Sequence, residues 1–235
     1  MRKINTDRIK VIAFDADDTL WDCQSHFNAV EQEYCQILSE YGDEQTVTAE
    51  LFKTETANMP ELGYGSKAFT LSLVENAVKI SKGKIDAHTL LRIQTLGRSL
   101  LNIPSTPLPG VEQTLRAIRA TGRYKMVVFT KGEILDQENK LIRSGLWDFF
   151  DRTEVVADKT PRQYRELCAT FGISIDQLLM VGNSFKSDIE PVLRLGGYAV
   201  HIPFEVTWAH ERVEEFDHDN LWRISHISQL TDIVV

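Results

Sequence analysis

Acids, an amide, a hydroxyl and lysines follow short apolar runs of this sequence, where the strands of a sheet would end. They are Asp15 and Asp17, Thr130 with Lys131, Lys159, and Asn183 with Asp188. In open parallel sheets, ligands bind beyond the carboxyl ends of the strands, so we expect these side chains to meet at one edge. Carboxylates beside ammonium groups are suited to holding a metal ion and a phosphoryl group.

Asp15 and Asp17 form the pair with the clearest chemical implication. In an extended chain, side chains two residues apart lie on the same side. Two close carboxylates repel each other unless a cation or a shared proton relieves them. Mg²⁺ prefers oxygen ligands and keeps room for water and phosphate. One carboxylate can then act as a metal-bound nucleophile, and the other can serve the leaving oxygen and water as acid and base.

Plainer explanations of the same acids remain open. Asp17 and the residues up to Thr19 would also suit a helix cap or a solvated turn. A calcium loop that starts at Asp15 does not fit, because Leu20 replaces the required glycine and His26 replaces the required glutamate. The catalytic interpretation is favoured by the three further polar segments, which a simple turn would not require.

Residues 14–20, FDADDTL, resemble the DxDx[TV]L signature of the haloacid dehalogenase superfamily, most of whose members are phosphatases. The later segments follow in the order of that family. Thr130 is similar to the Ser/Thr of its second motif and Lys159 to the lysine of its third. Asn183 and Asp188 are similar to the acidic fourth motif. The resemblance covers the core at both ends of the chain.

The resemblance implies a role for each matched residue. Asp15 would form a phospho-aspartyl intermediate. Asp17 would be the general acid/base, and its presence points to phosphate-ester hydrolysis, since dehalogenases lack this second aspartate. Thr130 and Lys159 would hold and neutralise the phosphoryl oxygens. Lys131 is not one of the matched residues; beside Thr130, it would either contact the substrate phosphate or only lie at the start of a helix.

The resemblance also implies a magnesium site. Mg²⁺ would sit on Asp15, the main-chain carbonyl of Asp17, and Asp188, with Asn183 contributing directly or through water. Many relatives carry Gly-Asp where this chain has Gly182-Asn183. An amide oxygen can bind Mg²⁺ but brings no charge, so we expect a site with one negative charge fewer and retained activity.

Alternating strands and helices are expected to position these side chains. The expected strands are Val11–Phe14 and residues 125–130, 153–156, 177–182 and 198–202. Helical patterns lie between them, at Val111–Ala120, residues 133–144, Pro161–Phe171 and residues 188–195. This alternation predicts an α/β fold, a doubly wound (Rossmann-like) parallel sheet with helices on both faces.

Residues 21–107 carry only helical periodicity, and a proline-rich stretch leads back to the core. We expect an all-helical cap domain inserted into an α/β catalytic core made of residues 1–20 and 108–235. Its helices are expected at residues 26–41, 48–58, 67–80 and 86–101. Tyr64 and Lys67 are candidate substrate contacts, although the glycine-flanked segment that holds them would equally suit a plain turn between helices.

The composition narrows the function classes. With 43% hydrophobic and 26% charged residues, the chain has the balance of a soluble globular protein. Its net charge of -8 disfavours nucleic-acid binding, and any phosphate site must carry its own local positive charge. Three scattered cysteines predict neither disulfides nor structural zinc. No signal or membrane segment is expected, so the predicted location is the cytoplasm. The oligomeric state stays open.

The sequence therefore favours a Mg²⁺-dependent hydrolase of a small phosphorylated metabolite, a phosphomonoester, acting through Asp15. A phosphosugar mutase would use the same residues and remains an alternative. A non-catalytic phospho-accepting module is a further alternative, but such modules are usually shorter and have no need of Asp17. The sequence does not identify the substrate, because loops of the cap would set specificity.

Overall fold

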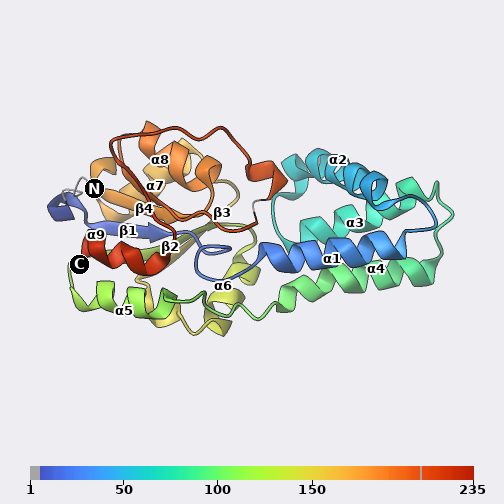
Figure 1. Ribbon diagram of the computed structural model, residues 1–235, viewed down its shortest axis with the longest axis horizontal. Coiled ribbons are helices and arrows are strands. Elements are labelled where there is room, and N and C mark those ends of the chain that lie inside the picture. The colour runs from blue at the N-terminus through green and yellow to red at the C-terminus, as the bar shows by residue number, and fades with distance from the viewer. Residues whose placement is uncertain (1–5, 207) are drawn as a thin grey trace. The chain divides into compact units, whose positions relative to one another are not determined.

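The computed structural model describes residues 6–206 and 208–235, and the chain divides into two compact units (Figure 1). The first unit, here called the core unit, comprises the segment that ends at Gln24 together with Pro104–Val235. The second, here called the helical unit, is Ser25–Ile103. In these described ranges, no helix is both long and apolar enough to cross a membrane.

A parallel sheet forms the centre of the core unit. Its strands are β1 (Val11–Phe14), β2 (Lys125–Lys131), β3 (Arg152–Val156), β4 (Leu178–Gly182), β5 (Tyr198–His201) and β6 (Leu221–Arg223). They lie in the order β3-β2-β1-β4-β5-β6, and every neighbouring pair is parallel. This confirms the predicted α/β, Rossmann-like fold class. The first, second and fourth motifs follow β1, β2 and β4, which lie side by side in the order β2-β1-β4.

Helices cover both faces of the sheet (Figure 1). They are α5 (Val111–Ala120), α6 (Ile134–Arg143), α7 (Pro161–Phe171), α8 (Glu190–Arg194) and α9 (Thr231–Val234). On one face, Leu115 of α5 and Val234 of α9 share a buried cluster with Ile12. On the other, Tyr164 of α7 packs with Ala13. Because successive residues of β1 face opposite sides, a strand covered twice is apolar throughout.

Two local elements differ from the sequence-based expectation. β6 was not predicted, because three residues are too short to show a periodic pattern. The helix predicted over residues 188–195 is present as α8, but it spans only Glu190–Arg194, and a π-helical turn, η5 (Phe185–Ile189), precedes it. Ser184 caps the turn by accepting a hydrogen bond from the main-chain N–H of Ser187, so the helical chain begins earlier. Pro191 has no N–H to donate, which interrupts the α-helical pattern.

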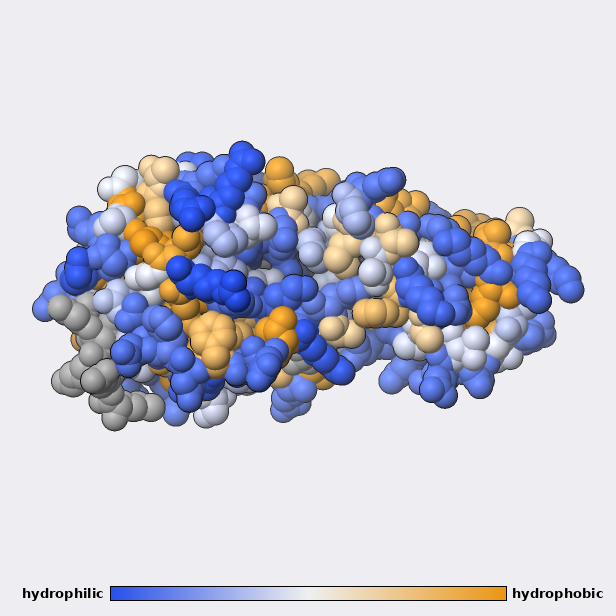
Figure 2. Space-filling view, turned by 90° about the horizontal axis from the view of Figure 1, so that it is seen from above, coloured by the Kyte–Doolittle hydropathy of each residue, from blue (hydrophilic) through white to orange (hydrophobic). Residues whose placement is uncertain are grey.

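The helical unit contains α1 (Gln24–Ile37), α2 (Glu44–Leu62), α3 (Ser66–Ile80) and α4 (Ala87–Ser99). Aspartates begin two of these helices. Asp43 accepts from the N–H of Thr46 at 2.8 Å, and Asp86 accepts from the N–H groups of His88 and Thr89. Each satisfies an N–H that the first turn leaves without a helical partner. The visible face of this unit is mostly hydrophilic, with apolar side chains interspersed (Figure 2).

Helices α3 and α4 approach each other closely at Gly97. A Cβ atom at this position would lie 2.5 Å from Oγ1 and 2.9 Å from Cγ2 of Thr70. Thr70 is itself fixed, since its hydroxyl donates to the main-chain oxygen of Ser66 at 2.6 Å. The glycine is therefore required by packing rather than by backbone conformation.

We expect Gly97→Ala to destabilise the protein by about 1–3 kcal/mol, because the added methyl group overpacks the contact with Thr70. In an uncrowded helix the same change would stabilise by about 1 kcal/mol, so the sign is diagnostic. Urea unfolding followed by circular dichroism measures the difference. Adding Thr70→Ala should recover part of the loss, and stabilisation by Gly97→Ala alone would contradict the close packing.

Candidate active site

Asp15 lies at the carboxyl end of β1, beside the buried ammonium group of Lys159. Lys159 Nζ is 2.5 Å from Asp15 Oδ1 and 2.6 Å from Asp188 Oδ1. All three residues are buried. Thr19 Oγ1 donates to the other oxygen, Asp15 Oδ2, at 2.9 Å. Side chains that are far apart in the sequence thus meet at the edge predicted for them.

Asp188 is fixed by the chain that follows β4. Its Oδ2 accepts from the main-chain N–H of Ser184 at 3.0 Å. A Cβ atom at Gly182 would lie 2.2 Å from that same oxygen, so only glycine leaves room for the carboxylate. Asn183 Oδ1 is 3.2 Å from Thr19 Oγ1, the hydroxyl that also contacts Asp15. The predicted fourth motif therefore lies against the first.

The cluster holds more negative than positive charge. The pKa of Asp15 is raised to about 7: burial raises it most, the Lys159 ammonium lowers it, and the negative charge of Asp188 raises it. Burial also raises the pKa of Asp188 above its ordinary value, although Lys159 again opposes the shift. Burial lowers the pKa of Lys159, but the two carboxylates outweigh this effect and the net shift is upward. Two acids share one ammonium, and a further cation would relieve both.

The oxygen donors at this point suit a hard divalent ion. Among residues 6–206 and 208–235, no group of three or more His, Cys, Asp or Glu side chains is arranged to hold a metal ion. The donors here are instead two carboxylates, from Asp15 and Asp188, and the amide oxygen of Asn183. Mg²⁺ typically takes one or two carboxylates and fills its shell with water and substrate phosphate. The residues present therefore fit such an ion.

Asp17 is held by donors that the sequence did not identify. Trp21 Nε1 donates to Oδ1 at 2.7 Å, and Gln137 Nε2 donates to Oδ2 at 2.8 Å. Lys140 Nζ lies 3.1 and 3.0 Å from the two oxygens. Burial raises the pKa of Asp17, but the charge of Lys140 and these hydrogen bonds outweigh it, so the pKa lies below the ordinary value. Asp17 is ionised in this arrangement.

Gln137 and Lys140 lie one helical turn apart on α6, and both are buried. The sequence did contain a signal for them. Residues three apart share a face of a helix, so two polar residues on the inward face of an otherwise amphipathic helix need buried partners. Trp21 is fully buried, and its indole N–H also donates to Asp17.

Thr130 and Lys131 end β2, the strand that pairs with β1. Thr130 is buried, and its hydroxyl donates to the main-chain oxygen of Lys131 at 3.3 Å. Lys131 Nζ donates to Ser187 Oγ at 2.8 Å and forms an ion pair with Glu211. Lys131 does not begin a helix, because α6 starts at Ile134. Sequence reasoning did not identify Glu211.

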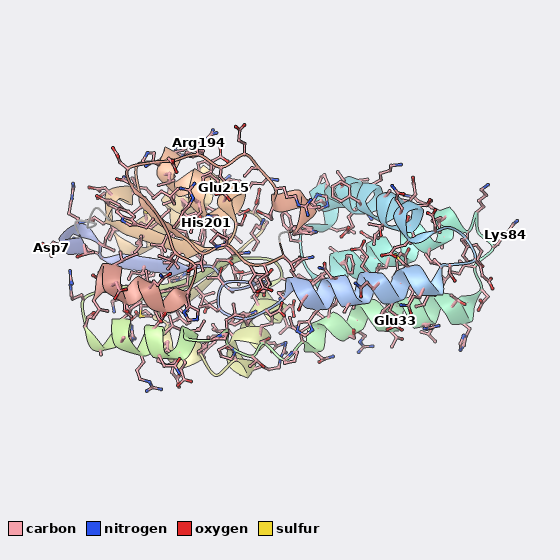
Figure 3. The ribbon with its side chains drawn as sticks, in the orientation of Figure 1. Asp7, Glu33, Lys84, Arg194, His201 and Glu215 are labelled. Atoms are coloured by element: carbon pink, nitrogen blue, oxygen red, sulfur yellow. The ribbon has the colours of Figure 1, made fainter. Side chains whose placement is uncertain are left out.

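His201, at the end of β5, supports the main chain beside the site. Its Nε2 is 3.0 Å from the main-chain oxygen of Asn183, and its Nδ1 is 3.8 Å from Glu215 Oε2 (Figure 3). A carbonyl oxygen only accepts, so Nε2 carries the hydrogen. Burial lowers the pKa of His201, which favours the neutral ring. The histidine therefore acts as a structural residue.

Tyr64 and Lys67 belong to the helical unit, in and after the turn between α2 and α3. Two glycines shape that turn: Gly63 has φ 70° and Gly65 has φ 120°, both in the region that favours glycine. Lys67 is exposed in the first turn of α3. The contact of these two side chains with substrate stays a prediction.

Comparison with known proteins gives consistent matches. Residues 9–196 match a family model described as haloacid dehalogenase-like hydrolase. The chain is 26% identical over 231 residues to glyceraldehyde 3-phosphate phosphatase of Methanothermobacter thermautotrophicus, covering 96% of this chain and 100% of that protein. It is 27% identical over 239 residues to pyrimidine 5'-nucleotidase YjjG of Escherichia coli, covering 95% and 96%. The crystal structure of a haloacid dehalogenase-like family hydrolase from Xanthomonas campestris matches with a TM-score of 0.88 and 33% identity, covering 100% of this chain and 94% of that one.

The raised pKa of Asp15 predicts how stability depends on pH in metal-free protein. Between the ordinary pKa of 3.8 and about 7, the folded protein binds a proton at Asp15 that the unfolded chain has lost. The free energy of unfolding should therefore fall as pH rises through this window, by at most about 1.4 kcal/mol per pH unit from this group.

We expect Asp15→Asn to remove this contribution, so that the variant loses less stability than wild type between pH 4 and pH 7. Denaturant unfolding in the presence of EDTA at several pH values measures the difference. The control is Asp148→Asn, at an exposed position, which should leave the wild-type slope unchanged. A parallel pH profile for wild type and Asp15→Asn would contradict the assigned shift.

Proposed function

The chain belongs to the haloacid dehalogenase-like hydrolases, and on this premise we propose that it hydrolyses a small phosphomonoester with Mg²⁺, through a phospho-aspartyl intermediate on Asp15. The observation that carries the proposal is the buried contact of Lys159 with both Asp15 and Asp188. The names of two relatives, a glyceraldehyde 3-phosphate phosphatase and a nucleotidase, support a phosphate ester as the substrate class.

In the proposed first step, a carboxylate oxygen of Asp15 attacks phosphorus, and the bond from phosphorus to the ester oxygen breaks. Asp17 gives a proton to the departing oxygen. In the second step, Asp17 takes a proton from a water molecule that attacks phosphorus, which releases phosphate and restores Asp15. The ammonium of Lys159 and the hydroxyl of Thr130 would offset and orient the phosphoryl oxygens.

Mg²⁺, when bound, would supply positive charge to the phosphoryl group and to the carboxylates around it. The residues that would hold it are Asp15, Asp188, the main-chain carbonyl of Asp17, and Asn183. The hydrogen bond from Thr19 to Asn183 Oδ1 supports this set, because it orients the amide oxygen beside Asp15. The excess of negative charge in the cluster is the physical reason for a divalent ion.

Asp17 has a specific requirement in this mechanism. Its lowered pKa suits the second step, in which it accepts a proton from water. For the first step it must carry a proton, so its contact with Lys140 has to loosen when substrate is bound. A leaving group that departs readily as an anion makes this proton less important.

We also propose that the helical unit acts as a cap on the core, with Tyr64 and Lys67 contributing to substrate selection. The glycine-flanked turn before α3 supports this, because flexible backbone and an exposed amine are suited to an anionic ligand. A cytoplasmic location is part of the proposal, and the free, buried cysteines Cys23, Cys35 and Cys168 are in keeping with a reducing compartment.

We expect Asp15→Asn to lower turnover of an aryl phosphate by at least ~10²-fold, because the covalent nucleophile is lost. EDTA should abolish wild-type turnover, and added MgCl₂ should restore it. Steady-state release of phosphate is the measurement, with Asp148→Asn as a control that retains wild-type rates. Equal rates for wild type and Asp15→Asn, or rates indifferent to EDTA, would defeat the proposal.

We expect Asp17→Asn to slow the hydrolysis of alkyl phosphates far more than that of aryl phosphates with acidic phenols, because only a poor leaving group needs the proton. The dependence of kcat/KM on leaving-group pKa should therefore steepen in the variant. A uniform loss across the series would count against the acid/base role of Asp17.

A further inference from the structure

Glu211 forms a polar cluster with Lys131, Ser184 and Ser187 at the carboxyl edge of the sheet. It ends the short helix η6 (Ala209–Glu211), in the chain between β5 and β6. Its carboxylate accepts hydrogen bonds from Lys131 Nζ and from the hydroxyls of Ser184 and Ser187, the last at 2.7 Å. Only 14% of the Lys131 side chain and 11% of the Glu211 side chain are exposed. A partly buried ion pair with two further hydroxyl donors is held more firmly than an exposed surface contact.

This cluster adjoins the site around Asp15. Phe129 and Lys131 are two residues apart on β2, so their side chains leave the strand on the same face. Phe129 lies on the face that carries Lys159, since Lys159 Nζ is 5.6 Å from the centre of its ring. Ser187, which accepts from Lys131, directly precedes Asp188, which accepts from Lys159. The two lysines therefore occupy one face of one sheet edge.

Both lysines are already paired with carboxylates. Lys159 is shared by Asp15 and Asp188, and Lys131 is paired with Glu211. Burial raises the pKa of Glu211, but the charge of Lys131 and the hydroxyl donors lower it further, so the net shift is downward. The carboxylate is thus ionised at neutral pH. An incoming phosphoryl group that uses Lys131 has to compete with Glu211 for the charge of its ammonium group.

We propose that Glu211 is a positioning residue that competes with phosphoryl oxygens for the ammonium of Lys131 and so sets the affinity of the site for phosphate. The inference rests on the proposed phosphatase function for the identity of the anion. Ser184 and Ser187 continue to donate to Glu211 when Lys131 moves away, so the chain around η6 stays attached to the edge of the sheet. The exchange then costs one ion pair and no buried carboxylate is left without donors.

The test is calorimetric titration of inorganic phosphate, in MgCl₂, into wild type and Glu211→Gln. Glutamine keeps an oxygen that can accept from the serine hydroxyls but removes the charge that neutralises Lys131. We expect phosphate to bind about 5- to 20-fold more tightly, the order expected for a unit charge removed a few ångströms away in a partly buried site. The matched control is Glu214→Gln, at an exposed position of the same connection, which should not change the Kd.

The part played by Lys131 is tested by repeating the substitution in a Lys131→Met background. There Glu211→Gln should change the phosphate Kd by less than about 2-fold, because the ammonium that the two anions share is gone. A gain that persists without Lys131 would mean that Glu211 acts by simple repulsion, and it would overturn the proposed competition.

Folding is checked by the melting temperature of each variant. Glu211→Asp is the second variant, since it keeps the charge but withdraws it by one methylene, and it should tighten phosphate binding less than Glu211→Gln does.

Unchanged or weaker binding in both variants overturns the inference. Wild-type protein that binds phosphate but hydrolyses no phosphomonoester contradicts the proposed function alone, whereas a failure at Glu211 leaves that function standing.

Discussion

Two buried carboxylates that share one ammonium group are the interaction around which the core unit is organised. Bringing Asp15 and Asp188 to Lys159 requires β1 and β4 to be parallel neighbours, and it requires Gly182 to leave space for the carboxylate. Burying each charge costs several kcal/mol, which one shared ammonium offsets only in part. The cluster is therefore poor in positive charge, and this deficit is the physical basis for proposing a divalent ion and a phosphoryl ligand here.

A pattern repeats around this centre: Asp15 and Asp188 share Lys159, and Asp17 and Glu211 each pair with a lysine of their own. Lys140 pairs with Asp17 on the side of α6, and Lys131 pairs with Glu211 on the side of η5. The chain as a whole carries a net charge of -8, so positive charge for an anionic substrate must come from such local placement. Because these lysines are paired, an anionic substrate that used them would compete with the protein's own carboxylates.

The sequence predicted the structure best where polar motif residues directly follow a strand with a clear apolar pattern. The family resemblance of residues 14–20 is confirmed by the family match, and the α/β alternation is confirmed by the sheet, because apolar runs of four to six residues are long enough to read. The three-residue β6 and the π-helical turn at η5 depend on local details that periodicity does not encode. Lys140 was missed although its place on the inward face of α6 was a signal, and Glu211 was missed because no motif or strand end marks its pairing with Lys131.

The most direct test of the central claim is chemical trapping of the intermediate. Protein quenched in acid during turnover of a phosphomonoester, then reduced with borohydride and digested, should contain homoserine in place of Asp15, because borohydride reduces an acyl phosphate to the alcohol. Peptide mass spectrometry locates the change. We predict it at position 15 alone, and only when substrate is present. Steady release of phosphate with no modification at Asp15, or with the modification at another carboxylate, would contradict the account.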